Sequence, residues 1–321
     1  MTTPPAPPVR AVTPAGLEAC LAEVVAGAPA DQAAGLFDPE SRFRLVNREA
    51  VVFLGAARAL LLQLAHPWVA AGVAAHSVAL TDPLGRFHRT FGHVHPMVFG
   101  DRDQALDAAR RLYRRHAAVA GRLPGDGGGG AAGGGYMANR TDALAWVQAT
   151  LADTALLVHD LVLPPLAPAD RDAYWRDSRR FGLLFGIPLE GQPTDWAGFQ
   201  DLCRGLWGEA PPPVTQAARH VADSLFRGGP PWLRLPRWYL DLTATLLPPD
   251  LAAGFGLDTG PAARRRADRA LGVLRTAYPR LPTALRHVGP AREAAGRLRG
   301  RAGPDPWTRL LNRLWIGRPA L

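Results

Sequence analysis

The chain contains no lysine, since all 37 basic residues among its 321 are arginine. This absence excludes a Schiff-base lysine, a phosphate-binding P-loop lysine and a Ser-Lys dyad. Only two cysteines occur, Cys20 and Cys203, and they are far apart in the sequence. A paired-cysteine zinc site, an iron–sulfur cluster and a disulfide scaffold are therefore excluded as well. Histidine is the main side chain left for acid–base or metal chemistry.

A long uninterrupted hydrophobic run is also missing. Residues 51–65 are mostly apolar, but Arg58, His66 and Pro67 interrupt this stretch before the roughly 20 apolar residues that a membrane span needs. A buried core helix that breaks at Pro67 and resumes as far as Ala79 is expected instead. Residues 1–14 are rich in proline, lack the apolar core of a signal peptide and are expected to form an unstructured arm. These features predict a cytoplasmic protein.

The charge balance is basic, because 28 acidic residues leave a formal net charge of +9. Such a balance can attract polyanions. However, the arginines are spread along the chain and no nucleic-acid-binding motif occurs, so we expect no nucleic-acid partner. A basic module that binds a membrane or a polyanion is the alternative interpretation.

Helical periodicity dominates the chain, and strand-like alternation is scarce. Asp82 and Asp101 are each expected to cap a helix, the first of them short. A helix that is apolar nearly all round is expected from Thr141 to Leu163, and the glycine-rich residues 125–135 are expected to form a flexible loop. Further helices are predicted near residues 168–186, 195–208, 214–226, 236–247, 260–276 and 290–300. The sequence therefore predicts an all-α fold, with one globular multi-helix domain over residues 15–303.

One histidine occupies an apolar position on the inward stripe of its helix. The stripe after Asp101 consists of Ala105, Ala109, Leu112, His116 and Ala120. The opposite side is expected to carry Arg110, Arg111, Arg114 and Arg115, and Gly121 is expected to end the helix. Imidazole is a good axial ligand for haem iron, and such a stripe could line a haem pocket. The alternative is a core histidine that bonds to a backbone carbonyl.

A second group of polar residues shares one face of the preceding helix. Arg86, Arg89 and Thr90 are spaced at i, i+3 and i+4. Two guanidinium groups and a hydroxyl can stabilise an anion, a haem propionate or negative charge that develops on dioxygen. The alternative is a solvated basic face.

The remaining histidines offer weaker patterns. His66 and His76 lie in the apolar stretch around Pro67, are expected to be buried, and could act as acid–base groups near neutral pH. His66 could instead bond to carbonyls freed by Pro67. His93 and His95 form an H-x-H pair, but no third ligand follows at a recognisable spacing.

Four segments, in order, resemble the MpaB/latex-clearing-protein family, which includes the rubber oxygenases. They are LLLQLAHPWVAAGVAAHS at residues 60–77, DPLGRFHRTF at 82–91, VFGDRDQALDAARRLYRRHAAVAG at 98–121 and YMANRTDALAWVQATLADTAL at 136–156. The resemblance covers roughly residues 40–260. It implies a b-type haem buried among helices, with one histidine as the proximal ligand of the iron.

Matching the motifs residue by residue implies a role for each candidate. His116 corresponds to the proximal metal ligand, and Arg86-Phe87-His88-Arg89-Thr90 corresponds to the distal Arg-x-x-Lys-Thr motif of the rubber-cleaving branch. Arg89 replaces the lysine, and its guanidinium stays protonated, so it cannot serve as an iron ligand. Arg86, Arg89 and Thr90 would polarise dioxygen, and Arg86 would also contact the haem. His66 and His76 would shape the pocket or relay a proton.

These observations predict a haem b-dependent oxygenase. The resemblance implies O2 as the co-substrate, an olefinic or otherwise hydrophobic small organic molecule as the substrate, and an unidentified electron donor. Two alternatives remain open, a peroxide-dependent haem enzyme and a haem-free helical binding protein.

Residues 304–321 are expected to contain a separate amphipathic helix. One face carries Trp307, Leu310, Leu311 and Leu314, and the other carries Arg309 and Arg313. This pattern is typical of an interfacial membrane anchor, which would give the protein peripheral membrane contact. The alternative is that the apolar face packs on the protein's own core.

Overall fold

The computed structural model describes residues 11–76, 82–122, 135–209, 211–227 and 235–321. The fold is mostly helical, with 72% helix and 3% strand, which confirms the predicted all-α class. The glycine-rich residues 125–134 and the predicted helix end at Ala79 lie outside the described residues.

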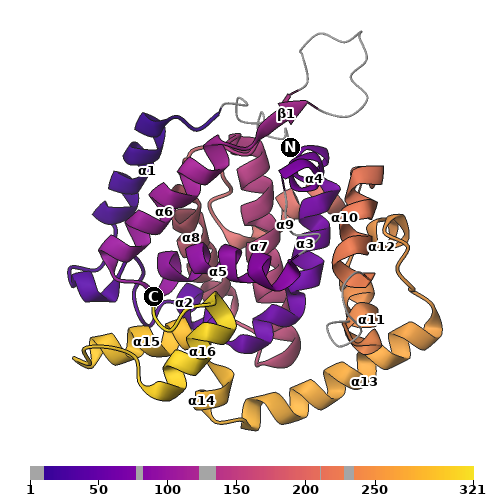
Figure 1. The fold of residues 1–321 in the computed structure, drawn as a ribbon. Coiled ribbons are helices and arrows are strands. Elements are labelled where there is room, and N and C mark those ends of the chain that lie inside the picture. Colours follow the sequence, from indigo (N-terminus) through magenta and orange to yellow (C-terminus); the bar gives the residue numbers. More distant parts are fainter. Residues whose placement is uncertain (1–10, 77–81, 123–134, 210, 228–234) are drawn as a thin grey trace.

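The central element is α7 (Thr141–Val162), which crosses the middle of the molecule in Figure 1. Its buried residues lie on nearly all sides, as expected for a helix without a polar face. Around it pack the 3-10 helix η2 (Ala50–Gly55) and the helices α3 (Ala56–Ala65), α2 (Arg42–Asn47), α8 (Pro168–Leu183) and α9 (Trp196–Cys203). The predicted end of this helix before Pro164 is confirmed.

The apolar stretch around Pro67 forms two helices, α3 and α4 (Pro67–His76). His66 between them is extended, because a residue that precedes proline avoids helical angles. The predicted break is therefore confirmed. Among the described residues, no single helix has both the length and the apolar character to cross a membrane; only the bent pair Ala50–Ala65 and Pro67–His76, at 104°, meets that test jointly.

Two longer helices follow, α5 (Pro83–Phe99) and α6 (Arg102–Ala117), and they pack side by side. The side chains of Asp82 and Asp101 accept hydrogen bonds from the first turns of these helices, so both predicted caps are confirmed. α5 has 17 residues and is not the short helix that was expected, because it continues through Pro96.

The predicted C-cap at Gly121 is wrong. α6 ends at Ala117, and Gly121 belongs to β1 (Ala120–Arg122), which pairs antiparallel with β2 (Gly135–Met137). The hydroxyl of Tyr136 lies where a side chain at position 121 would begin. The glycine is thus needed for the close approach of a ring rather than for the end of a helix.

The predicted unstructured arm is wrong for residues 11–14, and residues 1–10 lie outside the described residues. Val12 is buried in the core, and its amide donates to the Asn139 carbonyl at 2.8 Å. The Thr13 side chain caps α1 (Pro14–Ala26). Local composition alone missed this segment because its order depends on contacts with residues more than 100 positions away.

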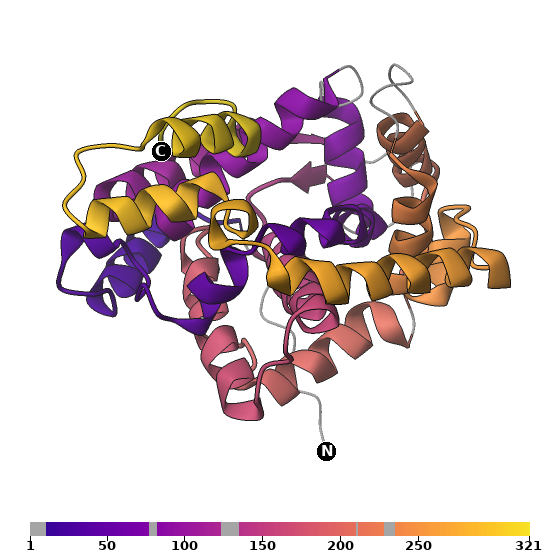
Figure 2. The same cartoon turned by 90° about the horizontal axis from the view of Figure 1, so that it is seen from below.

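Four of the other helices confirm the predicted series within a few residues. They are α10 (Gln216–Arg227), α11 (Arg237–Leu246), α13 (Pro261–Ala277) and α15 (Gly289–Leu298), and the predicted C-terminal helix is α16 (Pro306–Ile316). Two short helices, α12 (Pro249–Gly254) and α14 (Thr283–Arg286), and a π-helical turn, η4 (Arg204–Gly208), were not predicted as separate elements. Seen from below, α13 runs across the molecule beneath α7, and α16 lies beside α5 (Figure 2).

A buried ionic group joins the N-terminal half to the C-terminal helices. Glu49 accepts hydrogen bonds from Arg286 at 2.8 and 3.1 Å and from the Tyr278 hydroxyl at 3.0 Å. His287 lies 3.4 Å from the same carboxylate. We call these four residues the Glu49 cluster. It ties the start of η2 to α14.

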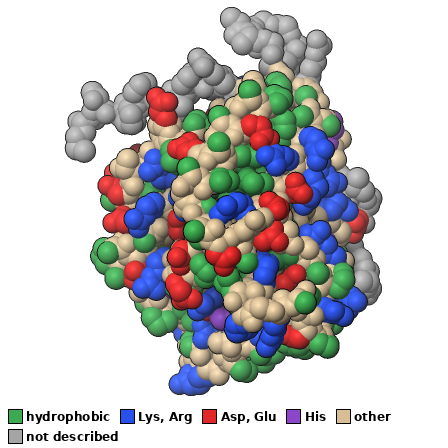
Figure 3. All heavy atoms as spheres, turned by 90° about the vertical axis from the view of Figure 1, so that its left-hand side faces the viewer, with side chains coloured by type: hydrophobic (Ala, Val, Ile, Leu, Met, Phe, Trp, Pro, Cys, Tyr) green, Lys and Arg blue, Asp and Glu red, His purple; other side chains and the backbone are tan. Residues whose placement is uncertain are grey.

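Surface arginines also pair with acids. Arg110 on α6 bonds to Glu18 on α1 at 2.8 Å. These elements lie on the left-hand side of Figure 1, and acidic and basic side chains are intermixed over that face (Figure 3).

The C-terminal helix α16 packs on the molecule through the buried residues Thr308, Asn312 and Ile316. Much of the predicted apolar face points away from the core, because Trp307, Leu310 and Leu314 are 39%, 54% and 58% exposed. The alternative in which this face covers the protein's own core is therefore wrong for Leu310 and Leu314, whereas the Trp307 indole donates a hydrogen bond to the Ala284 carbonyl at 3.0 Å. Membrane contact remains a prediction.

Candidate active site

A cavity of about 440 Å³ lies between α3, α4, α5, α6, α7 and β2. Its size is within the range of about 300–1,000 Å³ that is usual for small-molecule and cofactor sites. Five of the six residues singled out from the sequence line it: His76, Arg86, Arg89, Thr90 and His116. They come from three different helices, α4, α5 and α6. We call this space the active-site cavity.

The orientation of α5 explains how its polar residues reach the cavity. Phe91, His95 and Phe99 form a stripe at intervals of four residues, and Phe91 packs on Phe53 with 4.8 Å between ring centroids. Trp315 of α16 packs on the same Phe53 ring at 4.3 Å. Because these aromatic contacts fix the rotation of α5, the residues of the neighbouring stripe point into the cavity.

His116 is half-buried on the inner side of α6. Burial lowers the pKa of its imidazole to about 4, and the nearby His93 and Arg115 lower it further because they disfavour a second positive charge. His116 is therefore neutral at pH 7. A neutral imidazole keeps the lone pair that a metal ligand needs.

The arginines give the cavity a positive potential. Burial lowers the pKa of Arg86, with a smaller effect from Arg89, yet a guanidinium remains charged at neutral pH. Arg89 pairs with Asp82 at 3.1 Å, and both side chains are largely exposed at the rim. Among the described residues that line the cavity there is no aspartate or glutamate. The site is therefore suited to an anionic group.

Two further lining residues were not among the predicted site residues. His93 on α5 is half-buried, its Nδ1 has no hydrogen-bond partner within the described structure, and burial lowers its pKa. Its position four residues after Arg89 was the available signal, because that spacing continues the same stripe. Arg115 was expected on the opposite side of α6, but it also lines the cavity, since it adjoins His116 on a wide face.

His76 and His66 differ from expectation. His76 is exposed at the end of α4, where its Nε2 lies 3.2 Å from the Ala120 carbonyl oxygen and its ring packs edge-on against Tyr136. It therefore forms part of the rim rather than the buried interior. His66 is not among the residues that line the cavity. Its Nδ1 accepts a hydrogen bond from the Trp68 amide at 3.3 Å, so it caps the first turn of α4.

The rest of the lining is mainly apolar. It includes Leu64, Trp68, Val69, Val73, Leu144, Val147 and Leu151. Searched over the parts of the chain that the structure describes, no group of three or more His, Cys, Asp or Glu residues could hold a metal ion. What the cavity offers is thus two half-buried histidines with lowered pKa values, His93 and His116, three arginines and a mainly apolar remainder.

Comparison with protein families gives a match over residues 43–276, well over half of the chain. The matching family is described as ER-bound oxygenase mpaB/B'/Rubber oxygenase, catalytic domain. The chain belongs to this family. The match confirms the resemblance seen in the sequence motifs and indicates an oxygenase-family domain, and hence an oxidoreductase. The mpaB/rubber oxygenase domain runs from α2 to α13, so every element that lines the active-site cavity lies inside it.

Two curated relatives are described only as uncharacterized proteins, one from Mycobacterium bovis (strain ATCC BAA-935 / AF2122/97) and one from Mycobacterium tuberculosis (strain ATCC 25618 / H37Rv). Each is 32% identical over 144 residues, which is 43% of this chain and 54% of the relative. The chain thus matches about half the length of these relatives. No solved structure matches the chain.

Proposed function

We propose that the protein is a haem b-dependent oxygenase that acts with O2 on a small hydrophobic organic substrate. The observation that carries the proposal is the convergence of His116, Arg86, Arg89 and Thr90 on one cavity within a domain of the mpaB/rubber oxygenase family. Family membership supports oxygenase chemistry, and the character of the cavity supports the cofactor.

The residues of the cavity fit haem in three respects. The neutral imidazole of His116 could bind iron, and the single nitrogen ligand it provides is the kind found at proximal haem positions. Arg86 and Arg115 could bind the two propionates, because guanidinium groups suit carboxylates. The apolar wall would exclude water from the porphyrin faces. When bound, the haem would supply the redox-active iron that activates dioxygen.

Arg86, Arg89 and Thr90 would stabilise the negative charge that develops on dioxygen as it is reduced. A charge-assisted hydrogen bond from guanidinium is about twice as strong as a neutral one, and the partly buried position of Arg86 strengthens it further. The Thr90 hydroxyl can both accept and donate a proton in a hydrogen bond. Because a protonated guanidinium is not a practical iron ligand, neither Arg86 nor Arg89 would compete with dioxygen for the metal.

The remaining lining residues would bind and orient the substrate. Trp68, Val69 and Val73 on α4 and Leu144 and Val147 on α7 supply apolar surface to the cavity. Such walls favour an olefinic or otherwise hydrophobic molecule. His76 at the rim could relay protons between the cavity and solvent, because an imidazole ring has one nitrogen that can accept a proton and one that can donate it.

An absorption spectrum of the purified full-length protein, with and without dithionite, tests the proposal. We expect a Soret band that shifts on reduction, followed by oxygen consumption when a hydrophobic alkene is added with a reductant. A protein that shows no Soret band even after titration with haemin would contradict the cofactor. Turnover that requires peroxide and not O2 would contradict the oxygenase reaction.

A further inference from the structure

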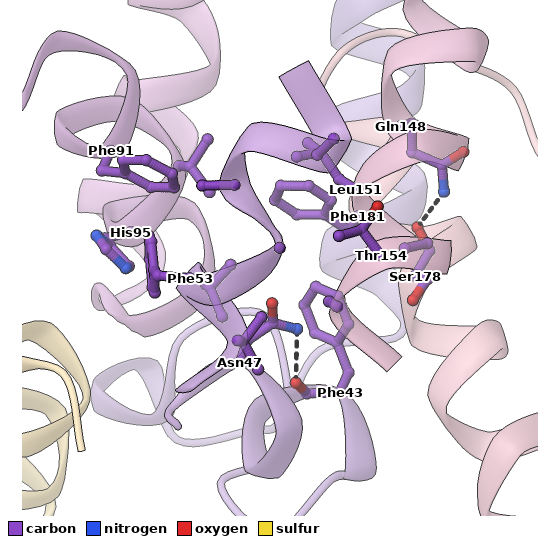
Figure 4. A pocket seen from close by; sticks show the side chains of 18 of the residues that line it. Phe43, Asn47, Phe53, Phe91, His95, Gln148, Leu151, Thr154, Ser178 and Phe181 are labelled. Carbon is purple, nitrogen blue, oxygen red and sulfur yellow. Dashed lines mark hydrogen bonds between the residues drawn. The ribbon is translucent and has the colours of Figure 1, made fainter. Parts of the chain in front are cut away.

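A second, smaller cavity lies beside the active-site cavity. It has a volume of about 100 Å³ and is lined by residues of η2, α2, α3, α5, α7 and α8. Four residues line both spaces: Phe91, Val94, Gln148 and Leu151. The two spaces are therefore separated by one layer of side chains. We call the smaller space the side chamber (Figure 4).

The wall of the side chamber is dominated by rings and small apolar groups. Phe43, Phe53 and Phe181 surround it, as Figure 4 shows, and Ala59 and Ala155 leave the space that larger residues would fill. His95 also contributes to the wall, and burial lowers its pKa to about 3, so it carries no charge. The chamber therefore holds no formal charge of its own.

The polar side chains of the wall make their hydrogen bonds within the protein. The amide nitrogen of Asn47 donates to the Phe43 carbonyl and that of Gln148 donates to the Ser178 carbonyl, both at 2.8 Å (Figure 4). The other such contacts are Ser178 Oγ to the Tyr174 carbonyl, the Tyr174 hydroxyl to the Ala152 carbonyl and Arg58 to Thr154 Oγ1.

Three polar atoms of the wall have no such contact within the described structure. They are His95 Nδ1 and the side-chain amide oxygens of Asn47 and Gln148. A buried water needs two to four polar partners at once, and these three side chains come from different sides of the chamber in Figure 4. The side chamber is therefore mainly apolar and is expected to hold water only weakly.

We propose that the side chamber binds a small apolar gas and serves as a reservoir for dioxygen beside the active-site cavity. An engineered apolar cavity of about 150 Å³ in another protein stays dry and binds xenon or benzene. At about 100 Å³, the side chamber suits a diatomic gas better than a ring or a long chain. The identification of the gas as dioxygen rests on the proposed oxygenase function. Passage between the two spaces would require movement of the side chains that they share, Phe91, Val94, Gln148 and Leu151.

Xenon is the probe for this site, because it occupies dry apolar cavities and needs no turnover. The 129Xe chemical shift is titrated against the full-length protein loaded with haem. We expect a saturable, protein-dependent shift that is lost in Ala155→Leu, whose added methyl groups fill the chamber. Ala145→Leu is the control, because Ala145 lies on the same helix and lines neither space.

If Ala155→Leu does not fold, the smaller substitution Ala155→Val is used instead. We expect it to cause a partial loss of the xenon shift. The filled variants should also raise KM for dioxygen while kcat at saturating dioxygen stays unchanged. The absence of a saturable xenon shift in the wild-type protein would overturn the proposal, as would equal shifts in wild type and a folded Ala155→Leu protein.

Failure of this inference is distinguishable from failure of the proposed function. Xenon bound in the side chamber of a protein that does not take up haem would leave the site standing and overturn its link to dioxygen. Haem-dependent oxygenase activity without xenon binding would overturn the reservoir alone.

Discussion

The Glu49 cluster and the active-site cavity balance their charges in opposite ways. In the cluster, a buried carboxylate meets Arg286, His287 and a tyrosine hydroxyl at hydrogen-bonding or ion-pair distance. In the cavity, three arginines and three histidines line a space to which no aspartate or glutamate of the described chain contributes. Asp82 pairs with Arg89 only at the exposed rim.

This difference separates charge that serves stability from charge that serves binding. A buried ion whose partners all belong to the chain stabilises one arrangement of helices, and it leaves no capacity for a ligand. A basic wall around a cavity costs stability through mutual repulsion, and an anionic ligand can recover that cost. Substitutions in the two regions should therefore change different observables.

His116→Ala should have the largest effect, because it removes the proposed axial ligand of the haem. We expect loss of the Soret band while the helical circular dichroism is retained. His220→Ala is the control, since His220 is exposed on α10 and distant in function from the cavity. A His116→Ala protein with full haem content and an unchanged spectrum would assign the ligand to another histidine, with His93 the first to examine.

Glu49→Ala should lower stability and leave haem binding in place. Removing one partner of a buried ionic group typically costs about 3–5 kcal/mol, because the remaining charges are left buried without compensation. Urea unfolding followed by circular dichroism measures the free energy of unfolding. The matched control is Glu23→Ala, at an exposed position of α1. A loss similar to that of the control would mean that the cluster does not hold the helices together.

Lowering the pH should reproduce the loss of stability expected for Glu49→Ala. Burial alone would raise the pKa of Glu49, but hydrogen bonds from His287 and Arg286 outweigh it and lower the pKa from 4.5 to about 2. Because the folded pKa is the lower one, the contribution is complete above pH 4.5 and is lost as the pH falls toward 2. The shift corresponds to about 3 kcal/mol. The difference in unfolding free energy between wild type and Glu49→Ala should shrink over this range, and a constant difference would contradict the assignment.

Arg89→Ala should reduce the rate of oxygenation more than the haem content. Loss of one group that stabilises developing negative charge typically lowers kcat by about 10²-fold. Arg89→Lys tests whether charge or shape matters, and Arg313→Ala on the exposed side of α16 is the control. Parallel loss of haem and activity in Arg89→Ala would indicate that Arg89 holds the haem rather than the reacting oxygen.

The smallest effect is expected at α16, where a weak membrane interaction should depend on its exposed apolar residues. Trp307, Leu310 and Leu314 are exposed, and Arg309 and Arg313 beside them suit an anionic surface. Co-sedimentation with vesicles that contain phosphatidylserine should decrease in the variant Leu310→Ser/Leu314→Ser, with its thermal stability unchanged. Wild-type protein that stays in the supernatant at low salt would exclude this anchor.

Much of the site could be predicted from the sequence because its parts are local. The caps at Asp82 and Asp101 and the spacing of Arg86, Arg89 and Thr90 depend only on helix geometry, which repeats every few residues. His93 lies on the same stripe and could have been found by extending it one further turn. Helix geometry alone could not show that His66 lies outside the cavity. The chain breaks at Pro67, and the His66 side chain instead accepts a hydrogen bond from the first turn of α4.

By itself, the sequence determined the helical class, the break at Pro67, the capped starts of α5 and α6 and the polar stripe along α5. These follow from short-range sterics and hydrogen bonding, which neighbouring residues control. Only the tertiary structure decided that three helices bring their polar residues to one cavity, that Val12 is buried and that Trp307 is not. The side chamber was also decided only by the tertiary structure, since Phe43, Phe91 and Phe181 come together there from distant parts of the chain. Such spaces depend on how helices pack, and periodicity along a single helix carries no information about its partner.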